Sequence, residues 1–198
     1  MNTMNTAQYQ AIAGFTLDLG LVGSAEKSQV WVLSAMKDHG PAVVHLHWRI
    51  LGNEDDVCDA YQETFLRLAN LNDFRKPSSV KAYLYRTASN IAITILRRKK
   101  MRCKAQSFLV GRYSEQVDPD IPAELDVKAL CGKLRQALAR LPEYLSDVVI
   151  LHDLAEFSYQ EVAKILKIRT ATVRVYRHKA LTLLASLLSR NDSDGVCL

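Results

Sequence analysis

The sequence lacks the residue constellations on which most enzymes and metalloproteins depend. Its four cysteines lie far apart among 198 residues, without a Cys-x-x-Cys pair or a His-x-x-x-His nearby, so neither a disulfide framework nor a zinc site is indicated. No Ser/His/Asp or Cys/His set and no glycine-rich phosphate loop is visible. We therefore expect a protein that is not an enzyme, with no cofactor, no metal and no small-molecule substrate.

Long hydrophobic runs are absent as well. No uncharged apolar stretch approaches the roughly 18 residues that a membrane span needs. The opening residues, MNTMNTAQYQAIAGFTLDLGLVGSA, are mildly apolar, but they carry no basic leader and include Asp18, which argues against a secretory signal. Together with cysteines interpreted as free thiols, these absences predict a soluble, cytoplasmic protein.

Glycine and proline are also scarce, with eight and five residues, and no run alternates between apolar and polar residues. This pattern predicts an all-α fold. The chain carries a net charge of +5 and has a pI near 9.0, a balance that favours a polyanionic partner.

Two small helical domains are expected, separated by an acidic linker. The segment Ser114 to Asp126 contains two prolines and five acidic residues without a basic one, which favours an extended chain. The expected boundaries are 28–110 for the first domain, 111–126 for the linker and 127–190 for the second domain. Helices are expected at about 41–51, 54–69, 80–100, 127–140 and 142–154, with a further pair from 158 onward.

That last pair has the pattern of a helix-turn-helix. Ser158 and Glu161 form a capping box at the start of one short helix, and Thr170 suits the N-cap of the next about three residues after the first ends near Lys167. The second helix of such a motif enters the major groove of DNA. The stretch from 164 to 179 has six Lys or Arg residues and no acid. We expect Thr170, Thr172, Arg174 and His178 to face outward, and Arg169, Arg177 and Lys179 to reach phosphates.

The helix expected from residue 80 has a second basic face. Its core stripe is Leu84, Ala88, Ile91 and Ile95, and its opposite stripe is Tyr83, Arg86, Asn90, Thr94 and Arg97. An aromatic ring, an amide and guanidinium groups on one line suit unpaired bases and phosphates. No acid occurs from 81 to 104, and the apolar side is needed for the core, so nucleic acid is favoured over a membrane surface.

The preceding helix exposes an acidic patch. Val57, Tyr61, Phe65 and Leu68 should turn inward and leave Asp59, Gln62 and Glu63 outside. Such a patch could dock a basic protein partner. An ordinary solvated face with a Glu63–Arg67 pair fits the composition equally well.

Three segments in order resemble one family. They are DAYQETFLRL, then AYLYRTASNIAITILRRKK, then LARLPEYLSDVVILHDLAEFSYQEVAKILKIRTATVRVYRHKALTLL. Over about Pro41 to Leu188 the chain is similar to bacterial RNA polymerase sigma factors of the extracytoplasmic-function (ECF) class. The spacing of Pro77, Tyr83 and Leu84 is closest to the iron-uptake regulators of that class.

The resemblance implies a sigma region 2 domain at 28–110 and a region 4 domain at 127–190. It implies polymerase binding by Asp59, Gln62, Glu63 and Phe65. Recognition of the −10 element is implied for Asn72, Asp73, Phe74, Arg75, Lys76, Ser78, Tyr83, Arg86, Asn90, Arg97 and Arg98. Recognition of the −35 element is implied for Arg169, Thr170, Thr172, Arg174, Arg177, His178 and Lys179. The partners implied are RNA polymerase core, promoter DNA and a membrane-spanning anti-sigma factor.

The sequence departs from the family pattern at four positions. Tyr83 stands where Trp is usual and Thr94 where an acid is usual. Lys167 occupies a turn position usually held by Gly, where a left-handed backbone would cost about 1 kcal/mol. Arg177 replaces an aliphatic residue on the buried side, so it must snorkel or Tyr176 must turn in instead.

Two other functions remain open. A plain transcriptional regulator would bind duplex DNA through 158–180 and need no polymerase. An RNA-binding helical protein would use the face from Tyr83 to Arg97 and would not depend on Arg174.

Overall fold

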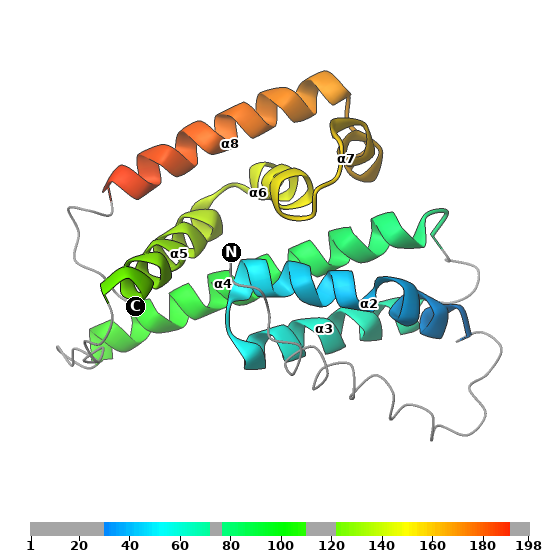
Figure 1. Cartoon of the computed structure of the whole chain (residues 1–198), viewed down its shortest axis with the longest axis horizontal. Helices are drawn as coiled ribbons and strands as arrows, with labels where there is room; N and C mark the ends of the chain where they lie inside the picture. The colour runs from blue at the N-terminus through cyan, green and yellow to red at the C-terminus, as the bar shows by residue number, and fades with distance from the viewer. Residues whose placement is uncertain (1–29, 72–76, 110–121, 191–198) are drawn as a thin grey trace. The chain divides into compact units, whose positions relative to one another are not determined.

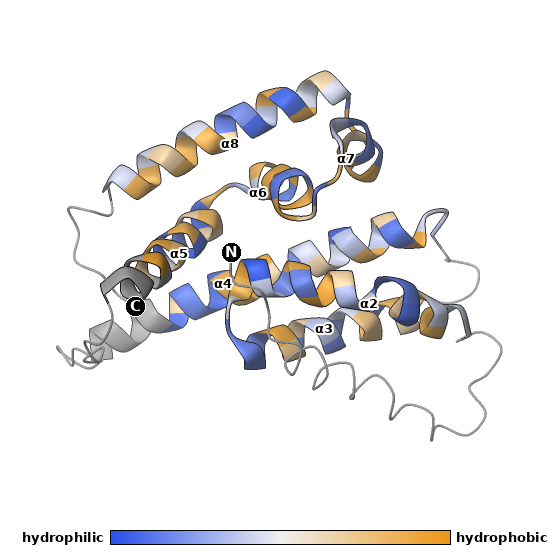
Figure 2. Cartoon of the chain, viewed as in Figure 1, coloured by the Kyte–Doolittle hydropathy of each residue, from blue (hydrophilic) through white to orange (hydrophobic). Residues whose placement is uncertain are grey.

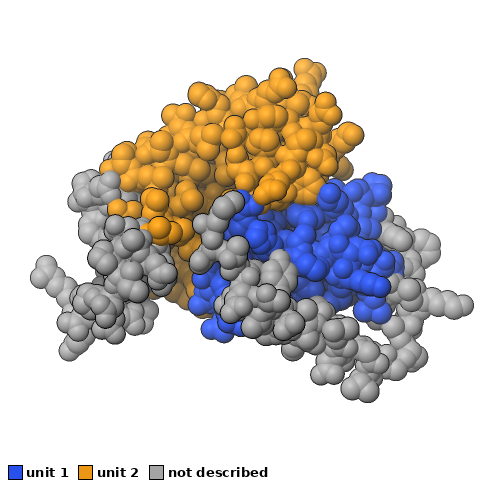
Figure 3. Space-filling view, in the orientation of Figure 1, with its two compact units in different colours: residues 1–91 blue, residues 92–198 orange. Residues whose placement is uncertain are grey.

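Every regular element that the structure describes is a helix (Figure 1). The structure is a computed structural model that describes residues 30–71, 77–109 and 122–190. Within these ranges the predicted all-α fold is confirmed. The packing divides the chain into two compact units, residues 1–91 and 92–198 (Figure 3).

The first unit contains α2 (Val30–Leu51) and α3 (Glu54–Ala69), which pack against each other. The chain turns between them at Gly52, whose φ of 67° suits a residue without a Cβ. Asn53 then caps α3 by accepting a hydrogen bond from the backbone N–H of Asp56 at 3.1 Å. Three acids in the first turn complement the helix dipole, so this helix starts where the sequence predicts.

Helix α2 starts eleven residues earlier than the predicted residue 41. Pro41 was expected to open the helix but lies inside it, where it lacks an N–H to donate. The neighbouring Gly40 has a packing role, because a Cβ there would lie 2.9 Å from the hydroxyl oxygen of Tyr61. The α2–α3 packing thus holds together a helix that local signals would divide.

The third long helix, α4 (Val80–Leu109), begins with Ser79, whose hydroxyl accepts from the Ala82 N–H at 3.2 Å. It extends nine residues beyond the predicted end near residue 100. The boundary between the two compact units falls within it, between Ile91 and Ala92. The three-part division at 110 and 126 expected from the sequence remains a prediction.

The second unit contains the remaining helices. They are α5 (Pro122–Arg140), α6 (Glu143–Val149), the π-helix η4 (Ile150–Leu154), α7 (Tyr159–Leu166) and α8 (Thr170–Arg190). Helix α5 starts five residues earlier than expected, because Pro122 suits the first helical position. The predicted linker therefore ends inside a helix, and its part at 111–121 lies outside the described residues.

Helix α8 packs against α5, α6 and α7. Hydrophobic and hydrophilic residues alternate along it (Figure 2), and its buried apolar residues include Val173, Ala180 and Leu184. The core of this unit includes Leu141, Leu145, Val148, Ile150, Leu151, Val162, Val173, Ala180 and Leu184. This core supports the helix-turn-helix described next.

Candidate nucleic-acid interface

The capping box at Ser158 starts α7 as predicted. The Ser158 hydroxyl accepts from the Glu161 N–H at 3.3 Å, and the Glu161 carboxylate accepts from the Ser158 N–H at 2.9 Å. Val162, Ala163 and Ile165 are buried beneath the helix. The start of the helix-turn-helix is therefore determined by local hydrogen bonds and one apolar face.

The turn after α7 runs through a left-handed residue. Lys167 has φ 56° and ψ 43°, and its N–H donates to the carbonyl of Ala163. The Ile168 N–H reaches the same carbonyl at 3.0 Å. The left-handed geometry anticipated for this non-glycine residue is confirmed.

Helix α8 begins at Thr170, as predicted, but the residue in the capping position is Arg169. The Arg169 carbonyl accepts from the Val173 N–H at 3.1 Å, which is the first bond of the helix. The predicted inner stripe of Val173, Ala180 and Leu184 is buried. Arg169, Arg174, His178 and Lys179 are exposed, whereas Thr170 and Thr172 are half-buried.

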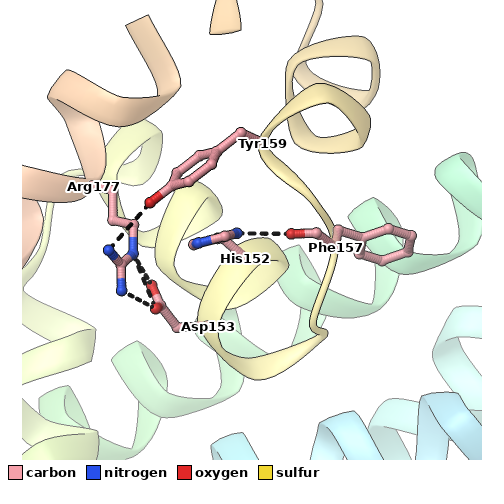
Figure 4. A network of polar contacts seen from close by, with 5 residues as sticks. All are labelled: His152, Asp153, Phe157, Tyr159 and Arg177. Carbon is pink, nitrogen blue, oxygen red and sulfur yellow. Dashed lines mark hydrogen bonds and ion pairs between the residues drawn. The ribbon is translucent and has the colours of Figure 1, made fainter. Parts of the chain in front are cut away.

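Arg177 has a partner inside the protein (Figure 4). Its Nε lies 3.0 and 3.1 Å from the two carboxylate oxygens of Asp153, and its Nη2 lies 2.7 Å from one of them. Its Nη1 donates to the hydroxyl of Tyr159 at 3.2 Å. These contacts explain how a cation occupies a position expected on the buried side of α8: the guanidinium is paired at the edge of the core. The hydrogen bond to Asp153 raises the pKa of Arg177 further above its usual value.

Tyr159 links this ion pair to the exposed side of α8. The His152 ring stacks on it with centroids 4.1 Å apart, and the Arg174 guanidinium lies 5.5 Å from its centre. His152 is itself oriented by the Phe157 carbonyl, 2.7 Å from its Nδ1 (Figure 4). Sequence reasoning missed Asp153 and Tyr159. They lie 24 and 18 positions before Arg177 in the chain, and only the fold brings them into contact with it.

The basic face of α4 has the predicted pattern in part. Leu84, Ala88 and Ile91 are buried, whereas Ile95 is half-buried. On the opposite stripe Arg86 is exposed and Tyr83 and Asn90 are half-exposed. The exposed cations along the described part of the helix are Lys81, Arg86, Arg98, Lys99 and Arg102.

Arg97, predicted to contact DNA, is engaged within the second unit. Its Nη2 donates to the carbonyl of Leu141 at 3.0 Å, and its Nε lies 3.4 Å from that of Ala139. These carbonyls lie where α5 ends, so the cation suits the negative end of that helix. In this conformation Arg97 is held, and its neighbour Arg98 is exposed.

The segment expected to recognise the −10 element is described only in part. Asn72, Asp73, Phe74, Arg75 and Lys76 lie outside the described residues, whereas Ser78 is exposed just before α4.

The acidic patch of α3 is present at the surface. Asp59, Gln62 and Glu63 are exposed, and the Glu63 carboxylate lies 2.7 Å from Arg67 Nε, the pair expected of a solvated face. Phe65 is 5% exposed and packs on Tyr61 in the core, as the apolar stripe predicts, and its contact with the polymerase stays a prediction. Leu66, which sequence reasoning missed, is 58% exposed beside the patch.

Neither a metal site nor a membrane span is found where the chain is described. No group of three His, Cys, Asp or Glu side chains among residues 30–71, 77–109 and 122–190 could hold a metal ion. None of the helices in those ranges is long and apolar enough to cross a bilayer.

Comparisons with known proteins match both halves of this arrangement. Sigma-70 region 2 matches residues 35–102, and Sigma-70, region 4 matches residues 131–184. The ECF RNA polymerase sigma factor SigW of Bacillus subtilis is 30% identical over 145 residues, which cover 69% of this chain and 78% of SigW. The chain belongs to the ECF sigma factors.

Other sigma factors extend the match. SigV of Bacillus subtilis is 25% identical over 84% of this chain and 96% of its own length. SigE of Mycolicibacterium smegmatis is 28% identical over 80% of this chain, which spans only 62% of that relative. The solved structure of CnrH in complex with the cytosolic domain of CnrY shares the fold, with a TM-score of 0.52 and 19% identity over 95% of this chain and 99% of CnrH.

Proposed function

We propose that this protein is a sigma subunit that binds RNA polymerase core and directs initiation at promoters with its own −10 and −35 elements. The observation that carries the proposal is the match of sigma regions 2 and 4, in that order, to the helices that bear the two basic faces. A plain regulator that binds duplex DNA would need only the second of these regions.

The polymerase contact is assigned to the exposed patch of α3. Asp59, Gln62 and Glu63 supply negative charge and hydrogen-bonding groups, and Leu66 supplies an apolar contact beside them. Interfaces of this kind pair complementary charge with a small apolar centre. Phe65 supports the patch from the core.

Promoter contacts are assigned to two surfaces. Tyr83, Arg86, Asn90 and Arg98 on α4, with Ser78 and the residues at 72–76, hold the melted −10 strand. Arg174, His178 and Lys179 on α8, with Arg169 just before it, bind the −35 duplex. Arg177 positions α8 through Asp153, and Arg97 joins the −10 surface only when it leaves the end of α5.

Family membership supports two finer proposals. One is an anti-sigma factor, membrane-spanning in this class, that restrains the protein. The other is the iron-uptake regulator type, supported by Pro77, Tyr83 and Leu84, which predicts target promoters beside genes of iron acquisition.

Charge reversal tests the polymerase contact. We expect Asp59→Lys with Glu63→Lys to abolish binding to purified bacterial core polymerase and run-off transcription from fragments of the source genome. The matched control, Asp38→Lys with Glu54→Lys, makes the same charge change at other exposed acids of the first unit. Circular dichroism checks that both variants fold.

Two results would contradict the assignment. Undiminished core binding by the Asp59/Glu63 variant would remove the patch from the interface. If the unmodified protein binds no core yet shifts duplex DNA alone, the plain regulator is the better function.

A further inference from the structure

The outermost side chains in the first two turns of α8 are those of uncharged residues, Ala171 and Val175. Successive residues of a helix are rotated by about 100°, so Ala171, Val175 and His178 follow one line, opposite the buried Val173 and Ala180. Val175 lies at the middle of this line, and its side chain is 50% exposed. Sequence reasoning assigned it no role.

The guanidiniums lie to one side of this line for structural reasons. Asp153 and Tyr159 hold Arg177 at the edge of the core, as Figure 4 shows. The same Tyr159 ring lies beneath Arg174. Both cations are therefore drawn toward α7, and the centre of the outward face is left to Ala171 and Val175.

A single exposed valine needs no explanation on an ordinary surface. Val175 differs because it lies between the exposed cations Arg174 and Lys179, in a stretch from 164 to 179 without an acid. Those flanking charges suit the two phosphate backbones beside a groove. A side chain centred between them faces base edges.

We propose that Val175, with Ala171 beside it, is a specificity-determining residue that packs on a thymine 5-methyl group in the duplex upstream element. Among the bases, only thymine presents a methyl group in the major groove, and small apolar side chains are its usual contacts. The inference rests on the proposed promoter-binding function and adds the base that α8 selects.

Polar bases at the same position should be disfavoured. The amino group of cytosine is a hydrogen-bond donor in the major groove. Contact with the isopropyl group of Val175 would remove the water bound to this amino group and would offer no acceptor in its place. Thymine would instead exclude water at no such cost. Selection thus comes from both attraction and rejection.

Removal of the thymine methyl group tests the proposal directly. The probe is a promoter duplex library with about one helical turn randomised upstream, selected with holoenzyme assembled from core polymerase and the full chain. The enriched sequence is then resynthesised with deoxyuridine in place of thymidine, one position at a time. We expect one replacement to weaken binding about fourfold, as expected for one buried methyl group.

Variants assign that effect to Val175. Val175→Ser should bring the thymidine-to-deoxyuridine ratio at that position to about one, and Val175→Thr, which keeps one methyl group, should give a value in between. Leu181→Ser, a matched change at another exposed apolar residue of α8, should leave the ratio unchanged. Thermal unfolding of each variant checks the fold.

The results that would contradict the Val175 inference differ from those that would also contradict the promoter-binding function. An enriched sequence with no sensitivity to deoxyuridine, or a ratio that persists in Val175→Ser, would overturn the inference and leave the promoter-binding function standing. A library from which the holoenzyme enriches no sequence would overturn both.

Discussion

At the scale of single residues, the turn of the helix-turn-helix contains a built-in strain. Lys167 adopts the left-handed conformation, which brings its Cβ close to the carbonyl oxygen. Local geometry demands this conformation, because the N–H groups of Lys167 and Ile168 both reach the Ala163 carbonyl. The left-handed conformation is strained, but it makes possible the short turn that orients α8.

Glycine at this position should relieve the strain. We expect Lys167→Gly to raise the free energy of unfolding by up to about 0.5 kcal/mol, because the greater freedom of glycine in the unfolded chain offsets much of the relieved strain. The matched control Lys164→Gly, at an exposed position within α7, should lower it by about 1 kcal/mol. Urea denaturation followed by circular dichroism measures both, and a loss of stability in Lys167→Gly would contradict the explanation.

At the scale of elements, η4, α7 and α8 are joined through one guanidinium. The Asp153–Arg177 pair spans 24 residues, and the side chains of Asp153 and Arg177 are 26% and 32% exposed. It is bidentate, and Tyr159 adds a third contact. A pair of this geometry restricts the rotation of α8 more than an ordinary surface pair would.

A double-mutant cycle measures this restriction. Asp153→Ala and Arg177→Ala should couple by on the order of 1 kcal/mol in the free energy of unfolding. The control cycle is Glu63 with Arg67, a more exposed pair on one helix, for which about 0.3–0.5 kcal/mol is expected. Equal coupling in the two cycles would show that the Asp153–Arg177 pair is merely a surface contact.

The two cycles should also differ in their response to salt. Added salt screens exposed charges more strongly, so the Glu63–Arg67 coupling should decline first.

At the scale of the whole molecule, the core of the first unit contains an uncharged histidine. His47 on α2 is fully buried, and burial lowers the pKa of its imidazole to about 4, against a smaller opposing effect from the backbone at Ala88. In the unfolded chain the same group titrates near 6.5. Between these values the unfolded state binds one more proton than the folded state.

The stability of the first unit should therefore fall as the pH decreases from 6.5 to 4. The expected slope is about 1.4 kcal/mol per pH unit, for a loss on the order of 3 kcal/mol, with no contribution from His47 above pH 6.5. Both tryptophans lie on α2, so their fluorescence follows this unit. His47→Leu should flatten the profile, whereas His45→Leu, at an exposed position, should not. An unchanged slope in His47→Leu would assign the pH dependence to another group.

Local signals in the chain were sufficient for the fold class and for most helix boundaries. The capping box at Ser158, the turn formers before α3 and the apolar stripes act over three to seven residues, so their outcome can be read from neighbours in sequence. They also predicted the buried stripe of Val173, Ala180 and Leu184. The acidic and basic surfaces followed, because charges excluded from a core must lie outside it.

Contacts between distant residues decided the rest. Arg177 and Arg97 were predicted as DNA contacts, but Asp153 and two carbonyls near the end of α5, 24 to 44 residues away, hold them within the protein. The burial of Phe65 on Tyr61, by contrast, is a contact between residues four positions apart and was predicted from the stripe of α3. A cation pairs with whichever acceptor the fold brings within hydrogen-bonding distance. A pattern of neighbouring residues does not predict which distant acceptor that will be. The outward position of Val175 follows from helix geometry, but only the tertiary structure shows that Asp153 and Tyr159 hold the neighbouring Arg177 and Arg174 to one side of it.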